Sequence, residues 1–197
     1  MPSALITGIS GQDGSYLAEN LLEDGFEVHG LVRRSSLEIQ EVKLARITKF
    51  INQLNLHPCS LESQTGLFEI VRTIKPDYLY HLGAQSFVSY GFEGEYATLD
   101  TNVGSTHALL SAVLKFVPHC RFYFAASSEI FGNAEISPQN ESTPFNPRTM
   151  YGISKLTGFQ LGRAFRENKK IHSCTGILYN HESPRRGKEY VTQKIIR

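Results

Sequence analysis

The sequence predicts an α/β fold in which a doubly wound parallel sheet carries helices on both faces. Apolar runs of strand length recur along the chain, and stretches with helical periodicity separate several of them. A third observation is that 41% of the 197 residues are hydrophobic, yet no apolar run reaches the ~18 to 20 residues that span a bilayer. Alternating strands and helices pair in parallel, with the helices as crossovers. We therefore expect one sizeable core and no membrane segment.

Six apolar runs bounded by turn residues are the expected strands. They cover residues 3–7, 27–32, 55–59, 77–82, 121–126 and 174–179. Leu67, Ile70, Val71 and Ile74 repeat at helical spacing, and Ala108, Val113 and Leu114 belong to a second helical face that starts after Gly104. Residues 132–148, rich in Asn and Pro, are an expected long loop. Loops of this length in compact domains are usually functional or disordered.

Charge and cysteine content narrow the class of protein. Twenty Lys and Arg residues against 19 Asp and Glu give a net charge of +1, which argues against a nucleic-acid-binding arm. The three cysteines have no CxxC spacing, so we expect reduced thiols. The histidines show no metal-ligand spacing. These features, with no basic leader at Met1, predict a cytoplasmic protein without metal, nucleic-acid or membrane partners.

The first expected strand ends in a glycine-rich turn. Gly8, Gly11 and Gly14 enclose Gln12 and Asp13 and precede a helix-like stretch. Glycines at this position permit a tight turn and let a diphosphate approach backbone N–H groups. The spacing is GxxGxxG rather than GxGxxG, and an ordinary turn is the alternative. Its place between strand and helix favours a Rossmann-like, NAD(P)-binding fold.

The second expected strand ends in Arg33, Arg34, Ser35 and Ser36. An acidic residue there would bind the free 2′-hydroxyl of NAD, whereas guanidinium groups bind a 2′-phosphate through paired hydrogen bonds. The sequence therefore favours NADP over NAD. A solvated arginine pair at a strand end is the alternative interpretation.

The fifth strand is followed by Ser127, Ser128 and Glu129, and Tyr151 and Lys155 lie about two dozen residues further on. Asn146 and Pro147 predict a helix N-cap and first helical residue, which would put Tyr151 and Lys155 on one helix face. A phenol that acts as a base near neutral pH needs its pKa lowered by ~3 units from about 10. A nearby lysine and a cationic nicotinamide would supply the charge. Alone, such a pair is more often a surface feature.

Together these residues resemble the extended short-chain dehydrogenase/reductase superfamily, with Asn102 as a further match. Within it, the chain is similar to the GDP-mannose 4,6-dehydratase family throughout its length. The similar stretches are residues 7–19, 28–36, 81–88, 127–129 and 180–187, and the last is the most specific.

The resemblance implies roles for individual residues. Tyr151 and Lys155 would serve the transfer at C4 of the sugar, Ser127 would hold the C4 oxygen, and Glu129 would remove the C5 proton. Together these four residues are the expected catalytic set. The expected NADP contacts are Gly8, Gly11, Gln12, Asp13, Gly14, Arg33, Arg34, Ser35, Ser60, Leu82, Tyr151, Lys155 and Arg185. Ser86, Ser128 and Asn180 are the expected substrate contacts. Arg185 and Arg186 would also touch a neighbouring subunit in a homo-oligomer.

The chain departs from the family pattern at several points. Ser60 stands in place of an aspartate that contacts adenine, Ser127 replaces a threonine, and Phe131 replaces a tyrosine. Family members also continue beyond the point that matches Arg197. We expect an NADP-binding domain at 1–180 and, at 181–197, the start of a substrate portion that is largely absent. Alternatives are a related reductase or epimerase, or a nucleotide-binding remnant without catalysis.

Overall fold

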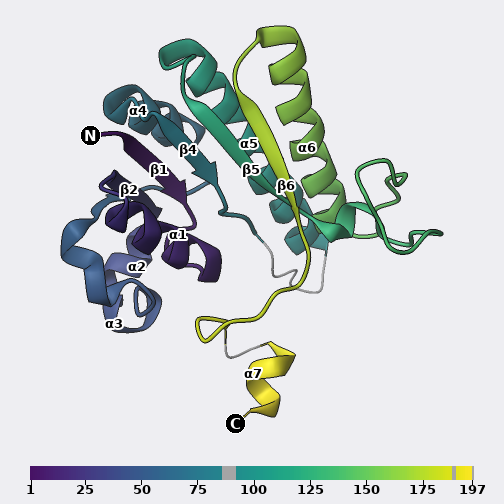
Figure 1. Cartoon of the computed structure of the whole chain (residues 1–197), viewed down its shortest axis with the longest axis horizontal. Helices are drawn as coiled ribbons and strands as arrows, with labels where there is room; N and C mark the ends of the chain where they lie inside the picture. The colour runs from purple at the N-terminus through teal and green to yellow at the C-terminus, as the bar shows by residue number, and fades with distance from the viewer. Residues whose placement is uncertain (86–91, 188–189, 197) are drawn as a thin grey trace.

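The computed structural model describes residues 1–85, 92–187 and 190–196. Six strands form one sheet in the order β3-β2-β1-β4-β5-β6, and every neighbouring pair is parallel (Figure 1). The strands are β1 (Ser3–Thr7), β2 (Glu27–Val32), β3 (Asn55–Pro58), β4 (Tyr78–His81), β5 (Arg121–Ser127) and β6 (Ser173–Leu178). The doubly wound parallel sheet and all six strands are confirmed, with boundaries within one residue of those expected.

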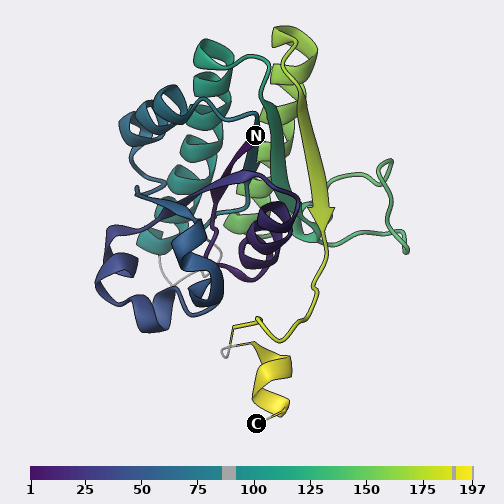
Figure 2. The same cartoon turned by 60° about the vertical axis from the view of Figure 1, so that its left-hand side comes forward.

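Helices cover both faces of this sheet, and Figure 2 shows the same layers from the side. They are α1 (Gln12–Glu23), α2 (Arg34–Glu38), α3 (Gln40–Lys43), α4 (Gln64–Ile74), α5 (Phe92–Phe116), α6 (Met150–Lys169) and α7 (Val191–Ile195), with 3₁₀ turns η1 (Thr48–Gln53) and η2 (Ser128–Ile130). Alternate residues of a strand face opposite sides. Ile6 therefore packs in the cluster of α1 and the segment after α3, whereas Leu5 packs in the cluster of α4 and α5.

Two helix boundaries differ from the sequence expectation. Helix α5 begins at Phe92, well before Gly104. The sequence pattern does not reveal this earlier start because residues buried there, such as Thr98 and Asn102, are polar rather than apolar. The expected N-cap at Asn146 is wrong: α6 begins at Met150, and the Thr149 hydroxyl accepts from the Gly152 N–H at 2.9 Å. The Asn146 amide instead donates to the Asn133 carbonyl at 3.2 Å, within the expected long loop.

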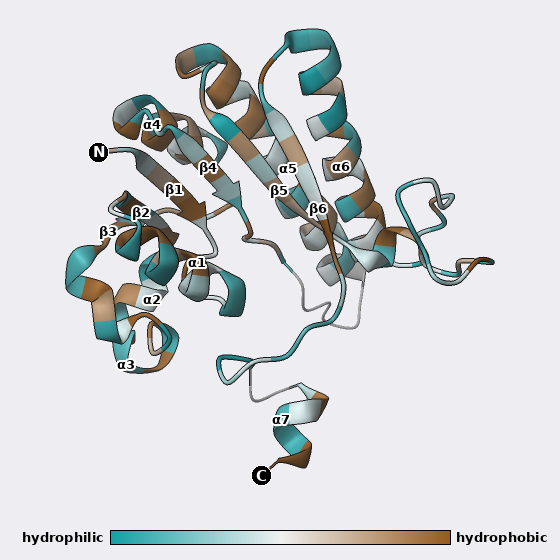
Figure 3. Cartoon of the chain, viewed as in Figure 1, coloured by the Kyte–Doolittle hydropathy of each residue, from teal (hydrophilic) through white to brown (hydrophobic). Residues whose placement is uncertain are grey.

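The hydrophobic residues lie mainly on the strands and the inward helix faces (Figure 3). The charged stretch 37–54 contributes to one core through Leu44, Ile47 and Phe50. Within the described residues β6 pairs with β5 alone and forms an edge of the sheet. Across the described ranges, no helix has the length and apolarity that a membrane crossing requires. Helix α7 lies apart, beyond the carboxyl ends of the strands (Figure 1).

Candidate active site

A cleft of about 1190 Å³ lies at the carboxyl ends of the strands. The strand order reverses between β1 and β4, and ligands of doubly wound folds bind at such a switch point. Most of the expected site residues line this cleft. They are Gly8, Gly11, Gln12, Asp13, Gly14, Arg33, Leu82, Ser127, Ser128, Glu129, Tyr151, Lys155 and Asn180.

The glycine turn forms one wall of the cleft, and its geometry requires glycine. Gly8 has a φ of +75°, and a Cβ there would lie 2.8 Å from the Gly83 nitrogen. A Cβ on Gly14 would lie 2.3 Å from the Gly8 carbonyl oxygen. Gly11 caps α1 without a side-chain hydrogen bond, so the positive helix end is open to an anion. This donor set fits the diphosphate of a dinucleotide.

At the end of β2, the four polar residues separate. Arg33 and Ser36 line the cleft, and an Arg33 Nη2 donates to the Gln85 side-chain oxygen at 3.5 Å. Arg34 and Ser35 are exposed on α2 and lie outside the lining. The Ser60 hydroxyl, which is also outside the lining, donates to the Glu62 carboxylate. Of these two arginines, only Arg33 therefore lines the cleft.

The opposite wall combines the end of β5 with the first turn of α6. The Ser127 hydroxyl accepts from the Glu129 N–H at 3.3 Å, which fixes the turn that carries Glu129. A Cβ on Gly152 would lie 2.7 Å from the Glu129 carbonyl oxygen. The small residue thus lets α6 approach this turn, and that approach brings Tyr151 beside Ser127 and Glu129.

Lys155 is buried, with 3% of its surface exposed, and donates to the Ala125 carbonyl at 2.7 Å. Burial lowers the pKa of Lys155 to about 8. Its Nζ lies 5.6 Å from the centre of the Tyr151 ring. Burial raises the pKa of Tyr151, and the Ser127 hydroxyl opposes that rise. This direction is opposite to the lowered phenol pKa that the sequence hypothesis requires with both Lys155 and a nicotinamide cation beside the ring, because burial desolvates Tyr151.

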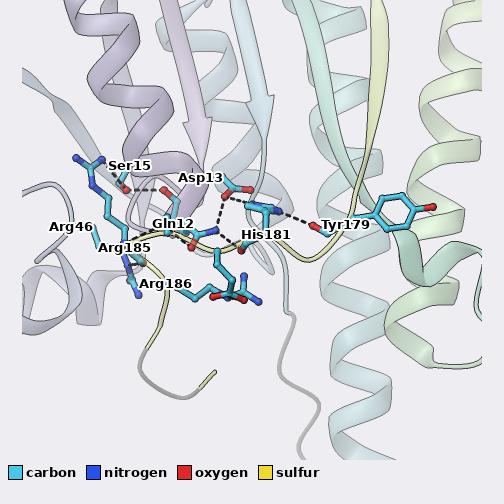
Figure 4. Close-up of polar contacts among 10 residues, drawn as sticks. Gln12, Asp13, Ser15, Arg46, Tyr179, His181, Arg185 and Arg186 are labelled. Atoms are coloured by element: carbon cyan, nitrogen blue, oxygen red, sulfur yellow. Dashed lines mark hydrogen bonds and ion pairs between the residues drawn. The ribbon is translucent and has the colours of Figure 1, made fainter. Parts of the chain in front are cut away.

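Residues 179–187, which we call the strap, follow β6 and cross the glycine turn (Figure 4). His181 Nε2 lies 2.7 Å from an Asp13 carboxylate oxygen, and its Nδ1 lies 2.7 Å from the Tyr179 carbonyl. Gln12 donates to the His181 carbonyl at 3.2 Å and accepts from the Ser183 hydroxyl at 2.9 Å. The strap and the first turn of α1 are thus joined by side chains that the sequence separates widely.

The two arginines of the strap have different surroundings. Arg185 pairs with Glu19, and its guanidinium carbon lies 4.0 Å from the centre of the Tyr16 ring. Arg185 is therefore held on α1, outside the cleft lining, whereas Arg186 lines the cleft. The expected substrate contact Ser86 lies outside the described residues.

Sequence reasoning missed several residues that line the cleft. These include Lys43, Arg46 and His181. Arg46 Nε donates to the Arg185 carbonyl at 2.7 Å, and its Nη1 donates to the Ser10 carbonyl at 3.2 Å. No local pattern marks Lys43 or Arg46, since the amphipathic stretch that carries them shows only its apolar period. The sequence signal for His181 is its place in the stretch 180–187, the most specific part of the family resemblance.

Comparison with known proteins identifies the family. The family model described as GDP-mannose 4,6 dehydratase matches residues 5–197. The chain is 44% identical over 203 residues to the GDP-mannose 4,6-dehydratase of Yersinia enterocolitica, covering 100% of this chain and 54% of that protein. It is also 44% identical over 200 residues to the human GDP-mannose 4,6 dehydratase, covering 98% of this chain and 54% of that one. The chain spans about half the length of these relatives.

Solved structures share the fold at lower identity. UDP-glucose 4-epimerase from Thermotoga maritima has a TM-score of 0.83 at 22% identity, covering 95% of this chain and 59% of that chain. The dTDP-glucose 4,6-dehydratase DesIV from Streptomyces venezuelae has a TM-score of 0.81 at 21% identity, covering 98% of this chain and 61% of that chain. These likenesses support the Rossmann-like architecture. Because the family model matches residues 5–197, nearly the whole of this chain, the chain belongs to the GDP-mannose 4,6-dehydratase family.

Proposed function

We propose that the protein acts in the NADP-dependent dehydration of GDP-mannose to GDP-4-keto-6-deoxymannose, a carbon–oxygen lyase reaction. The observation that carries this proposal is the presence of Glu129 in the same cleft as Ser127, Tyr151 and Lys155. A ketoreductase needs the last three only. Abstraction of a proton next to a carbonyl needs an additional base within reach of the sugar, and Glu129 is the carboxylate on that wall.

NADP, when bound, would accept a hydride from C4 of the hexose and return it to C6. Tyr151 acts as a phenolate, which the Lys155 ammonium stabilises, and takes the proton of the C4 hydroxyl to become a neutral phenol. Ser127 donates a hydrogen bond to the C4 oxygen. Glu129 takes the C5 proton, which the new C4 carbonyl makes acidic, and gives it to the hydroxide that leaves C6 as water. Tyr151 releases its proton to solvent and C5 takes one up from solvent once C6 is reduced, so the net change is the loss of one water.

The remaining assignments belong to the same proposal. Gly8, Gly11, Gly14 and Arg33 hold the coenzyme in a domain of residues 1–180, and Ser128, Ser86 and Asn180 contact the nucleotide sugar. Residues 181–197 begin the substrate portion. Three free cysteines suit a reducing, cytoplasmic compartment. A homo-oligomer with the strap arginines at a subunit contact is what the family resemblance implies.

Incubation with GDP-mannose and NADP in deuterated water tests the proposal. We expect deuterium at C5 of a 4-keto-6-deoxy product. Glu129→Gln should lower its formation by roughly 10²–10⁴-fold, the usual contribution of a general base. Glu135→Gln, which changes an exposed carboxylate outside the cleft lining, is the matched control and should leave the rate unchanged. A product without label at C5 would remove Glu129 from its role.

The two alternatives give different results in the same assay. Net oxidation of NADPH during turnover would indicate a reductase, since the dehydration returns its hydride. Tight NADPH binding without turnover of any nucleotide sugar, unaffected by Tyr151→Phe, would indicate a binding module without catalysis.

A further inference from the structure

His81 is the last residue of β4 and lies beneath the cleft rather than in it. Only 2% of its surface is exposed, yet both ring nitrogens have hydroxyl neighbours. Nδ1 is 2.8 Å from the Thr7 hydroxyl at the end of β1. Nε2 is 3.1 Å from the Thr106 hydroxyl on α5, with the Ser105 hydroxyl at 3.4 Å. The ring therefore joins β1, β4 and α5 at the point where the strand order reverses.

The neighbouring hydrogen bonds determine which ring nitrogen carries the proton. Thr106 has one hydroxyl proton and donates it to the Asn102 carbonyl at 2.7 Å, so it can only accept from Nε2 of His81. Nε2 therefore bears the hydrogen, and Nδ1 of the neutral ring accepts from Thr7. The Thr7 oxygen in turn accepts from the Gly83 N–H at 2.9 Å. In this arrangement the Gly83 N–H, the Thr7 hydroxyl, the His81 Nε2–H and the Thr106 hydroxyl each have an acceptor.

Both ends of this hydrogen-bonded chain reach the walls of the cleft. At one end, Gly83 is held against Gly8, where the backbones approach too closely for a side chain. At the other end, the Asn102 side chain accepts from the Gln85 N–H at 2.7 Å and donates to the Gln85 carbonyl at 3.1 Å. Asn102 also donates to the Ser154 hydroxyl at 3.0 Å.

Ser154 extends the network to α6, which carries Tyr151 and Lys155. Its hydroxyl donates to the carbonyl of Tyr151 at 2.7 Å. The network thus contacts the glycine turn, the segment 82–85 and the first turn of α6. Each of these elements contributes cleft-lining residues, and the His81 ring links the Thr7 hydroxyl at the end of β1 directly to the Thr106 hydroxyl on α5.

We propose that His81 is a positioning residue, whose neutral Nε2–H tautomer holds the glycine turn, the segment 82–85 and the Tyr151 helix in one fixed arrangement for the coenzyme. The coenzyme part of this inference rests on the proposed function. The tautomer and the ordering of the cleft walls do not, so they are tested separately.

The tautomer is tested by nitrogen-correlated NMR of the histidine rings in the ligand-free protein. We expect the neutral Nε2–H signature for His81 to persist well below pH 6. Burial lowers the pKa of His81 to about 3, and the Lys155 ammonium acts in the same direction. An Nδ1–H tautomer, or a ring protonated at about pH 6, would overturn the assignment.

The positioning role is tested with two threonines of α5 that differ in one contact. Thr98 and Thr106 are both fully buried, and each donates to the carbonyl four residues earlier, at 2.8 and 2.7 Å. Only Thr106 also accepts from His81. Thr106→Val should raise the hydrogen-exchange rates of the Gly83 and Gln85 amides about tenfold and weaken NADPH binding by a similar factor, because the ring N–H loses its nearer acceptor and keeps only the Ser105 hydroxyl at 3.4 Å.

Thr98→Val should change neither the amide exchange rates nor NADPH binding. Thr106→Ser keeps the hydroxyl and should leave both at the values of the unaltered protein. Equal effects of Thr98→Val and Thr106→Val on the two amides would reduce His81 to a general packing role and overturn the proposal. If the unaltered protein does not bind NADPH, the proposed function fails, while the amide exchange rates still decide the role of His81.

Discussion

Lys155 shows how burial prepares a residue for chemistry. An ammonium group in the interior is destabilised unless it has partners, and here its partners are the Ala125 carbonyl and the faces of the Phe124 and Tyr151 rings. With a pKa near 8, the group is charged at neutral pH while remaining close to its neutral form. Stability must therefore depend on pH through this residue.

Lys155→Met should make this dependence visible. Because the pKa in the folded state is about 8, below the unfolded value of about 10.4, the unfolded chain binds more protons between these values. The contribution of Lys155 to the stability of the unaltered protein thus rises with pH across this window, by on the order of 3 kcal/mol, whereas groups whose pKa burial raises, such as Cys120, contribute with the opposite sign. The variant should lack that rise in urea unfolding series. Lys115→Met, at an exposed lysine, is the control and should keep the rise. Loss of the rise in both variants would show that the rise does not report on Lys155.

Arg33 is the residue that tests the choice between NADP and NAD. Both Arg33 and Arg34 are exposed, but only Arg33 lines the cleft. Arg33→Ala should weaken NADPH binding by about ten- to a hundredfold, because a charge-assisted hydrogen bond to the 2′-phosphate is lost. Binding of NADH should change little. Arg34→Ala is the matched control in the same fluorescence titration, and an equal loss in both variants would show a diffuse charge effect instead.

At the scale of elements, the six strands follow from the sequence because each is an apolar run closed by turn residues, with no competing pattern. The starts of the helices are harder to predict from the sequence. The start of α6 depends on one hydroxyl, that of Thr149, and Asn146 and Pro147 offer an equally good local signal a few residues earlier. In the first part of α5 the buried residues include Thr98, Thr101 and Asn102, and Asn102 hydrogen-bonds to Gln85 and Ser154. Because these inward-facing residues are polar, a search for apolar residues at helical spacing does not find this part of the helix.

Gly158 tests the packing of α6 on β5. A Cβ there would lie 2.3 Å from the Phe124 ring, so Gly158→Ala should destabilise the protein by about 1–3 kcal/mol through overpacking. Gly104→Ala on α5 is its matched control, because the nearest atom, the end of the Gln64 side chain, is 3.4 Å away. There the helix gains up to about 1 kcal/mol. Thermal unfolding of both variants checks the prediction, which fails if they shift in the same direction.

At the scale of the whole molecule, the sequence predicts those parts of the site that are contiguous along the chain. The glycine turn, the β5 end and the Tyr151/Lys155 pair each lie within one short segment. Lys43, Arg46 and His181 reach the same cleft from distant segments, and only the tertiary fold brings them together. Arg185 and Arg186 are neighbours in sequence, yet the strap directs one to α1 and the other to the cleft. Adjacent identical residues give no local sign of that difference.

Two groups of histidines make the stability respond to pH in opposite directions. His29 and His57 lie in the sheet, and His181 lies in the strap. Burial lowers the pKa of His29 and His57, which share a hydrogen bond of 3.0 Å between β2 and β3. Their contribution to stability is present above pH 6.5 and is lost as the pH falls. His181 behaves in the opposite way, since its hydrogen bond to Asp13 raises its pKa. The stability it gives the strap is present below pH 6.5 and is lost as the pH rises through the raised value.

The strap should therefore loosen from the glycine turn in mildly alkaline solution, while the sheet stays intact. A protonated His181 can donate to both Asp13 and the Tyr179 carbonyl, whereas the neutral ring has one N–H and loses one of these contacts. Tryptic cleavage at Arg185 and Arg186, corrected for protease activity with a model peptide, should rise severalfold between about pH 6 and about pH 8. His181→Gln should cleave at one rate across this range. Arg46→Gln is the matched control: it removes two hydrogen bonds to backbone carbonyls without changing His181, so cleavage should rise by the same factor at both pH values. A pH response that survives in His181→Gln would show that another group governs the strap.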